Sequence, residues 1–190
     1  AEVNRPEVVA ACARVEAQAA EGRGLTLDAD LAADVPHVLT DREALRRVVC
    51  SLVENAIKYT PEGGRITLKA RESREPGVVE IGVRDNGVGI LPEDLPFVFE
   101  KFYRGRPAAS LPGERDPAGF PSEGSEAPGV GLGLYLARSI VGQLGGSISV
   151  ESPPAGQTAG TAFTLHLPVW REEGVAAPEE GEDVEALTRG

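Results

Sequence analysis

The sequence predicts a two-layer α/β (α+β) sandwich, with three long helices packed on one face of a mixed β-sheet. Two observations predict this class. Apolar residues recur at helical spacing in three separate segments, and other segments alternate apolar and polar residues as half-buried strands do. The order along the chain is helix, hairpin or loop, helix, two strands, loop, helix, two strands. Packing as two layers buries the apolar side of both kinds of element.

Local signals define the ends of the predicted elements. Pro6 stands near the first turn of the first helix, where its missing N–H is tolerated. Asp41 is expected to cap the second helix, which runs to about Tyr59 and ends before Pro61 and two glycines. Helices are predicted at residues 6–20, 42–59 and 131–146, and strands at residues 24–30, 36–39, 65–72, 78–85, 147–152 and 160–168. The predicted connections include a turn at residues 74–77, a short helical turn after Pro92 and a hairpin connection at residues 150–160.

Two segments have no periodic pattern. Residues 104–129 are rich in glycine, proline, alanine, serine and charged residues. A loop of this length inside a domain is usually functional or disordered. Residues 171–190 are mainly acidic and small, so we expect a disordered tail behind a single domain of residues 1–170.

The composition excludes several classes of protein. Apolar residues make up 41% of the 190 residues, enough for one domain with a core. No apolar run approaches the ~20 residues that span a bilayer, and no signal peptide is visible. The net charge of −11 argues against a nucleic-acid-binding face. The sequence contains no methionine, so we expect it to be a piece of a longer protein.

Cys12 and Cys50 are the only cysteines, and both fall in helical patterns. We expect two buried free thiols instead of a disulfide, which fits a reduced cytosolic compartment.

The second helix carries polar residues beside its apolar stripe. On a helical wheel, Ser51, Asn55 and Lys58 lie along one edge of the stripe, and Tyr59 lies nearer its centre. An amide oxygen at such an edge can bind Mg²⁺, which prefers oxygen ligands, and a lysine one turn on can offset phosphate charge. The alternative is that Asn55 is a polar residue bonded to a neighbouring loop.

The motif "VRDNGVGI" follows the predicted strand that ends at Asp85. A carboxylate at a strand end can accept a hydrogen bond from an exocyclic amine such as that of adenine. Gly87 and Gly89 permit close approach of a ligand to the backbone. The alternative is a simple hairpin turn at "DNG", although no clear returning strand follows.

Two further motifs flank the long loop. "GVGLGL", residues 129–134, places glycines at the entrance to a helix, where free N–H groups and the positive end of the dipole attract phosphate. It matches neither a Walker loop nor a Rossmann fingerprint, and a flexible hinge is the alternative. "FVFEKFYRG", residues 97–105, clusters aromatic residues that can anchor the start of the loop or form a small satellite of the core.

The four stretches together are far more specific than any one of them. In their order, the chain resembles the ATP-binding catalytic domain of bacterial two-component sensor histidine kinases, in the GHKL superfamily. "VENAIKYT" is similar to the N box, "DNGVGI" to the G1 box, "FEKFYRG" to the F box and "GVGLGL" to the G2 box. "GTAF" is similar to the closing glycine-threonine motif. The resemblance covers about residues 7 to 168 and implies a Bergerat fold that binds ATP and Mg²⁺.

The resemblance also implies roles for individual residues. Asn55 matches the Mg²⁺-binding asparagine, Asp85 the carboxylate that reads the adenine amine, and Arg104 an arginine near the γ-phosphate. Asn55, Lys58 and Arg104 are the expected catalytic residues, with Asn55 the metal ligand. The residues expected to line the ATP site are Asn55, Lys58, Tyr59, Asp85, Gly87, Gly89, Ile90, Tyr103, Arg104, Val130, Gly131, Leu132, Gly133, Leu134 and Thr161.

The sequence departs from the family pattern in three places. Ser51 stands where these kinases usually carry another asparagine, and related ATPases of the gyrase type carry a general-base glutamate. The loop of residues 104–129, which corresponds to the ATP lid, is long for the family. The acceptor histidine is missing, because neither His37 nor His166 lies in a plausible dimerisation helix.

The activity that the resemblance implies is transfer of the ATP γ-phosphoryl group to a histidine. The acceptor is expected on the dimerisation domain of the parent kinase, which is absent from this chain, with a response regulator as an indirect partner. We expect a monomeric cytoplasmic domain, without nucleic acid, of a parent kinase bound to the membrane. The alternatives are an ATP-sensing module that lacks kinase activity and a GHKL serine kinase that acts on anti-sigma partners.

Overall fold

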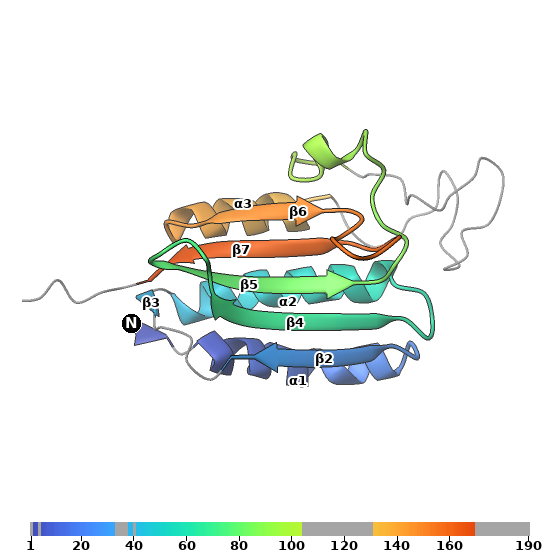
Figure 1. Ribbon diagram of the computed structural model, residues 1–190, viewed down its shortest axis with the longest axis horizontal. Coiled ribbons are helices and arrows are strands. Elements are labelled where there is room, and N and C mark those ends of the chain that lie inside the picture. Colours follow the sequence, from blue (N-terminus) through green and yellow to red (C-terminus); the bar gives the residue numbers. More distant parts are fainter. Residues whose placement is uncertain (1, 4, 33–37, 40, 104–130, 170–190) are drawn as a thin grey trace, which may run out of the picture.

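In the part of the chain that the structure describes, a mixed five-stranded sheet carries three helices on one face (Figure 1). The computed structural model describes residues 2–3, 5–32, 38–39, 41–103 and 131–169. The helices are α1 (Arg5–Glu21), α2 (Arg42–Tyr59) and α3 (Gly133–Gln143), with a short 3₁₀ helix η1 (Leu95–Phe97). The strands are β1 (Glu2–Val3), β2 (Thr26–Leu31), β3 (Val38–Leu39), β4 (Arg65–Glu72), β5 (Val78–Asp85), β6 (Ser147–Glu151) and β7 (Ala162–Pro168). The predicted two-layer class is confirmed.

The sheet has the strand order β2-β4-β5-β7-β6. β2 pairs with β4 in parallel, and the other three pairs are antiparallel, which makes the sheet mixed as predicted. β1 and β3 form a separate two-stranded ribbon. Along β4 and β5 the side chains alternate, so Ile66, Leu68, Ile81 and Val83 face the helices and are buried. The polar residues between them lie on the open face of the sheet.

Helix α2 forms the centre of the helical layer. The side chain of Asp41 caps it, because Oδ1 accepts hydrogen bonds from the N–H groups of Glu43 at 2.9 Å and Ala44 at 3.1 Å. Thr60 ends the helix, and its hydroxyl donates to the carbonyl of Ala56 at 2.6 Å. The predicted apolar stripe of Leu45, Val48, Val49, Leu52 and Ala56 is confirmed as buried, and Cys50, Val53 and Ile57 are buried in addition.

The third helix is shorter than predicted. It begins at Gly133 instead of residue 131, because Gly131 adopts a positive φ of 70° that no helix contains. It ends at Gln143, before Gly145 with a φ of 74°.

The expectation of two free thiols is wrong. Cys12 of α1 and Cys50 of α2 form a disulfide, with their Cα atoms 5.7 Å apart. Both cysteines lie on the buried faces by which the two helices pack, and packing brings the side chains within bonding range. The spacing of 38 residues along the sequence contains no information on this contact.

Several predictions fall on residues that the structure does not describe. These are the lid of residues 104–129, the tail of residues 171–190, Arg104, Val130 and His37. The division into a domain of residues 1–170 and a tail therefore stays a prediction. Within the described residues, no helix combines the length and the apolar character needed to cross a bilayer.

Reduction of the disulfide should lower the stability of the domain. A cross-link between residues 38 positions apart restricts the unfolded chain and contributes about 2–4 kcal/mol. For a domain of this size, we expect a melting temperature about 10 °C lower after reduction. Calorimetric melts with and without a dithiol reductant measure the difference. Thiol titration of the denatured chain should give two thiols after reduction and none before. Equal melting temperatures for these two states would contradict the prediction.

Candidate functional site

A buried carboxylate lies where β5 ends. Asp85 is 5% exposed, and its Oδ1 accepts hydrogen bonds from the N–H groups of Gly87 at 2.9 Å and Thr161 at 3.1 Å. In the described part of the chain, Oδ2 receives no hydrogen bond. A buried acceptor without a donor is costly, so this oxygen marks a place where a ligand N–H can bind.

Burial raises the pKa of Asp85 to about 6, because the charged form loses its hydration. The hydrogen bonds from Gly87 and Thr161 act in the opposite direction and limit the rise. At neutral pH the group is therefore ionised inside the protein, and it presents a negatively charged acceptor at the end of the strand.

The loop after Asp85 does not return as a hairpin, so the alternative of a simple turn is wrong. Instead the loop runs against the C-terminal end of α2, where the N–H of Val88 donates to the carbonyl of Tyr59 at 3.1 Å. A Cβ atom at Gly87 would lie 2.4 Å from that carbonyl oxygen, so only glycine fits. The loop then reaches Ile90, whose N–H donates to the hydroxyl of Ser152 at 2.8 Å.

The polar edge of α2 lies between this loop and the start of α3. At one end of the edge, Ser51 lies beside α3, since its Oγ is 3.4 Å from the position of a Cβ on Gly133. At the other end, Tyr59 contacts the loop through its carbonyl group. Asn55 lies one helical turn from each of them and is half-buried, as is Lys58. The structure thus places Asn55 and Lys58 between the loop that contains Gly87 and Gly89 and the glycine-rich entrance to α3.

Tyr59 does not lie near the centre of the apolar face, so this part of the prediction is wrong. It is the last residue of α2 and is 37% exposed, whereas Ala56 and Ile57 in the same turn are buried. The Nζ atom of Lys58 lies 5.1 Å from the centre of the Tyr59 ring.

The segment before α3 is held to the segment after η1. The N–H of Phe102 donates to the carbonyl of Gly131 at 3.1 Å, and Phe102 adopts a φ of 65°. The hydroxyl of Tyr103 donates to Oδ1 of Asp94 at 2.7 Å, and Asp94 is 6% exposed. These bonds bring residues 102 and 131 together, so the two ends of the chain that flank residues 104–130 meet at one place.

Among the described residues, no side chain caps the N-terminus of α3. Leu132 occupies the N-cap position, and the first helical hydrogen bond runs from Leu136 to Leu132. The helix itself therefore leaves the N–H groups of Gly133 and Leu134 without partners. This end of the helix, next to Ser51 and Asn55 of α2, can bind an anion such as a phosphate.

The structure brings most of the predicted residues together around α2. Asp85, Gly87, Gly89 and Thr161 surround the strand end, with Ile90 following in the same loop. Gly131, Leu132, Gly133 and Leu134 form the entrance to α3, and Tyr103 lies beside Gly131. Sequence reasoning missed Ser152 and Asp94, which lie outside the four motifs and act by bonding to them.

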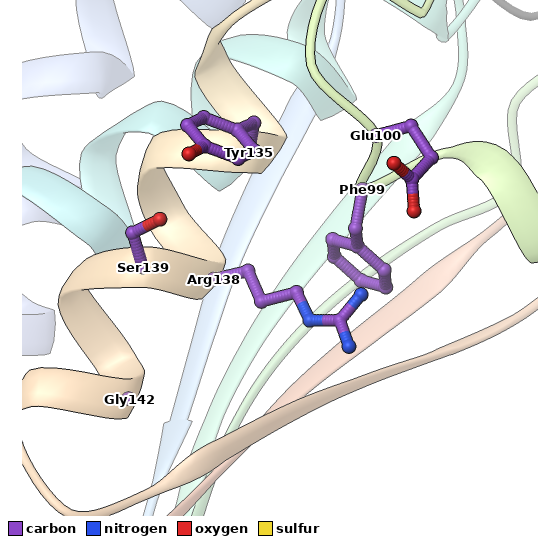
Figure 2. A pocket seen from close by; sticks show the side chains of 6 residues that line it. All are labelled: Phe99, Glu100, Tyr135, Arg138, Ser139 and Gly142. Atoms are coloured by element: carbon purple, nitrogen blue, oxygen red, sulfur yellow. The ribbon is translucent and has the colours of Figure 1, made fainter.

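A groove of about 310 Å³ lies beside α3 (Figure 2). On one side it is lined by residues of α3 that share a face at helical spacing, and on the other by the segment after η1. The guanidinium group of Arg138 lies 5.7 Å from the centre of the Phe99 ring. The lining residues are Phe99, Glu100, Tyr135, Arg138, Ser139 and Gly142.

Comparison with known proteins identifies the family. Residues 40–171 match the family described as histidine kinase-, DNA gyrase B-, and HSP90-like ATPase, and the chain belongs to this family. Its curated relatives include the adaptive-response sensory kinase SasA of Synechococcus sp. (strain CC9311), which is 35% identical over 169 residues. The signal transduction histidine-protein kinase/phosphatase MprB of Mycobacterium ulcerans (strain Agy99) is 36% identical over 132 residues.

These two matches cover 89% and 69% of this chain but only 38% and 22% of the relatives' own lengths. Among solved structures, the mycobacterial sensor histidine kinase MprB matches with a TM-score of 0.71 at 28% identity. That match covers 88% of this chain and 97% of the other. The catalytic domain of the histidine kinase ThkA shares the fold, with a TM-score of 0.69 at 22% identity over 89% of this chain and 97% of that one. The fold is therefore that of histidine kinase catalytic domains.

Asp85 should make the stability of the domain depend on pH. Its pKa in the folded chain lies above the ordinary value of 3.8, so the native state binds this proton more tightly than the unfolded state does. The stabilisation is complete below pH 3.8 and is lost as the pH rises to about 6. A rise in pKa from 3.8 to about 6 corresponds to about 3 kcal/mol.

The Asp85→Asn variant has a similar shape but cannot ionise, so its unfolding free energy should lack this fall of about 3 kcal/mol. Urea unfolding of both proteins at pH 4 and pH 7.5 measures the difference. The wild-type protein should lose stability relative to the variant between these pH values. Parallel pH profiles for the two proteins would contradict the assignment.

Proposed function

We propose that the chain binds Mg-ATP and donates the γ-phosphoryl group to a histidine on a separate dimerisation domain of its parent kinase. The observation that carries this proposal is that two groups able to bind a ligand lie on either side of the polar edge of α2. One is the buried Oδ2 of Asp85, which lacks a donor within the described residues, and the other is the uncapped N-terminus of α3. A base with an exocyclic amine suits the first site, and phosphates suit the second.

The base end of the site consists mainly of backbone. Gly87 and Gly89 let the loop pack directly on neighbouring groups, because a Cβ atom would clash with the carbonyl of Tyr59 at Gly87 and crowd the hydroxyl of Ser152 at Gly89, and Gly89 has a φ of 76°. The ionised carboxylate of Asp85 accepts from the amine, and an ionised acceptor makes a stronger hydrogen bond than a neutral one. Tyr59, at the exposed end of α2, covers the ring from the solvent side in this proposal. A solved relative of the same fold, ShkA, has been crystallised in complex with AMPPNP, which supports a nucleotide as ligand.

The donor set at the phosphate end fits Mg²⁺ that arrives with the nucleotide. Mg²⁺ commonly takes one or two protein oxygen atoms, together with water and phosphate oxygens. Asn55 offers an amide oxygen on the edge of α2, and the Ser51 hydroxyl lies one turn before it. Bound Mg²⁺ would neutralise charge that develops on the transferring phosphoryl group. Lys58 adds positive charge at the same edge, and the N–H groups of Gly133 and Leu134 hold phosphate oxygens in place.

Phosphoryl transfer requires mainly alignment and charge neutralisation, which these residues provide. Arg104, which lies outside the described residues, is proposed to contact the γ-phosphate. No glutamate stands at position 51 to activate water, so the proposal is transfer to another group instead of hydrolysis.

The acceptor histidine is proposed to lie on another domain. His166 lies on the open face of the sheet, where its Nε2 is 3.0 Å from Oγ of Ser149 and its Nδ1 is 3.9 Å from Oε1 of Glu80. That face is opposite the helices and the proposed ATP site, so His166 cannot reach the phosphates. His37 lies outside the described residues, so the assignment of the acceptor to a partner domain, which would bring it to the end of α3, is part of the proposal. Exposed apolar side chains near this end, Phe97, Phe102, Tyr135 and Leu136, are proposed to contact that partner.

Transfer is tested by mixing the chain with the dimerisation domain of its own parent kinase and radiolabelled Mg-ATP. We expect acid-labile label on the dimerisation domain and none on this chain alone. The rate should be low, because the covalent link and its effective concentration are missing. Nucleotide binding without any transfer would favour an ATP-sensing module, to which Ser51 in place of an asparagine also points. Label on the isolated chain would contradict the assignment of the acceptor to another domain.

Nucleotide binding should raise the stability of the isolated chain. A ligand that binds only the folded state stabilises it by ~2.7 kcal/mol at a hundredfold excess over its dissociation constant. Melts with and without millimolar Mg-ATP should therefore differ by several degrees. The Asp85→Asn variant should bind both ATP and ADP about tenfold or more weakly, because a mispaired buried donor costs about 1–3 kcal/mol. Wild-type melts unchanged by nucleotide, with no heat of binding in calorimetry, would exclude the proposed function.

Asn55→Ala should separate metal binding from folding. We expect Mg-ATP to bind at least about tenfold more weakly, whereas ADP in the presence of a chelator should bind as before. The apo stability should stay within about 0.5 kcal/mol, because alanine is a good helix former at a half-buried position. Isothermal titration and urea unfolding measure both quantities. The matched control is Glu54→Ala, at the exposed neighbouring position of α2, which should change neither. Loss of apo stability with unchanged Mg-ATP affinity would show that Asn55 has only a structural role.

A further inference from the structure

The connection between β6 and β7 runs past the base end of the proposed site. Ser152 lies at its start, and Gly160 and Thr161 lie at its end. The Ser152 hydroxyl accepts a hydrogen bond from the N–H of Ile90 at 2.8 Å and donates one to the carbonyl of Gly160 at 2.7 Å. One half-buried hydroxyl therefore joins the loop of residues 87–90 to the residues that precede β7.

The carboxylate of Asp85 joins the same two segments a second time. It accepts from the N–H of Gly87 in the loop and from the N–H of Thr161 at the start of β7. The N–H of Asp85 also donates to the carbonyl of Thr161 at 2.9 Å. Two links thus run side by side between the segments, one through Ser152 and one through Asp85.

Close packing of backbone couples the two links. A Cβ atom at Gly160 would lie 2.2 Å from the carbonyl oxygen of Asp85. A Cβ atom at Gly89 would lie 3.1 Å from Oγ of Ser152 and 3.3 Å from the carbonyl oxygen of Gly160. Because the segments touch through backbone atoms, a change of their separation at Ser152 must also change the contacts of Asp85.

Arg84 fixes the middle of the connection from the open face of the sheet. Its Nε donates to Oε1 of Gln157 at 3.1 Å, and its Nη2 donates to the carbonyl of Ala155 at 2.7 Å. The middle of the connection is thus held to β5 independently of Ser152. The role that Ser152 can have is therefore to hold the two ends of the connection, residues 152 and 160–161, close to the loop of residues 87–90.

We propose that Ser152 is a positioning residue for the nucleotide base. Its hydroxyl holds the loop of residues 87–90 against Gly160 and Thr161, so that Asp85 keeps both backbone donors and directs its remaining oxygen at the base. A hydroxyl suits this position because one atom must accept one hydrogen bond and donate another. This inference rests on the proposed function, since it assumes that a base binds at Asp85.

The test compares ligands that contain the base with one that lacks it. Ser152→Ala should weaken the binding of ADP and of adenosine about tenfold, because the freed N–H and carbonyl group let the loop move away from Asp85. Binding of inorganic tripolyphosphate, which reaches only the α3 end, should not change. Ser152→Thr keeps a hydroxyl and should restore most of the affinity for ADP. Titration calorimetry or NMR shift titration measures all three ligands.

Ser149→Ala is the matched control. Ser149 is an exposed serine of β6 whose hydroxyl lies beside His166 on the open face, so its loss should leave ADP binding unchanged. A second measurement needs no ligand. Amide hydrogen exchange at Gly87 and Thr161, whose hydrogen bonds go to Asp85 and not to Ser152, should become faster in Ser152→Ala and stay unchanged in Ser149→Ala.

The outcomes distinguish this inference from the function on which it rests. If wild-type protein binds no ADP, the proposed function is contradicted, and the positioning role of Ser152 is contradicted with it. If wild-type protein binds ADP and Ser152→Ala binds it equally well, only the present inference is overturned. Equal weakening of ADP and tripolyphosphate, without rescue by threonine, would show a general loss of structure and would also overturn it.

Discussion

The burial of one face of α2 is the constraint on which the other features depend. Its apolar stripe packs on the inner faces of β4 and β5, and α1 and α3 pack against it on either side. Each fully buried leucine or valine of that stripe contributes about 1.5–3 kcal/mol. This packing fixes the rotation of the helix about its axis. It therefore also fixes the direction of the polar edge that carries Ser51, Asn55 and Lys58.

The proposed site lies at the ends of strands and helices, and not in the well-packed core between them. β5 ends at a buried carboxylate whose pKa is raised, α2 ends at an exposed tyrosine, and α3 begins without a cap. Within the described residues, the carboxylate and the start of α3 each leave a polar group without its usual compensation, and the sheet and helices provide the stability that tolerates it. Proteins commonly keep such features where a ligand supplies the missing partner. In the function proposed above, the groups of Asp85 and of the N-terminus of α3 that lack partners among the described residues form the two ends of one binding site.

The two faces of the sheet have separate roles. The inner face carries the core, and the open face carries ion pairs between strands, such as Arg71 with Glu80 and Lys69 with Asp30. The exposed pair of Lys69 with Asp30 contributes little to stability, and both pairs keep this face polar. Arg84 differs from them, because it bonds to the connection between β6 and β7 and so influences the site from the opposite face.

Much of the fold could be predicted because its signals are local. The alternation in residues 65–72 and 78–85 predicted β4 and β5 with their observed bounds, and Asp41 predicted the start of α2. The end of β5 and the glycine spacing after it placed Asp85, Gly87 and Gly89 at one strand end. These features depend on neighbours within a few residues, which is the range over which periodicity, capping and turn preferences act. The family resemblance then connected four such local motifs that no local rule could connect.

The sequence by itself determined the three helices, the main strands and the residues of the four motifs. Tertiary structure alone decided the Cys12–Cys50 disulfide, the exposed position of Tyr59 and the late start of α3 at Gly133. It also decided that Ser152 bonds to Ile90, 62 residues away, and that Asp85 bonds to Thr161, 76 residues away. The physical reason is the same in each case. These contacts join segments far apart along the chain, and their partners are chosen by how helices and strands pack, which no pattern within either segment records.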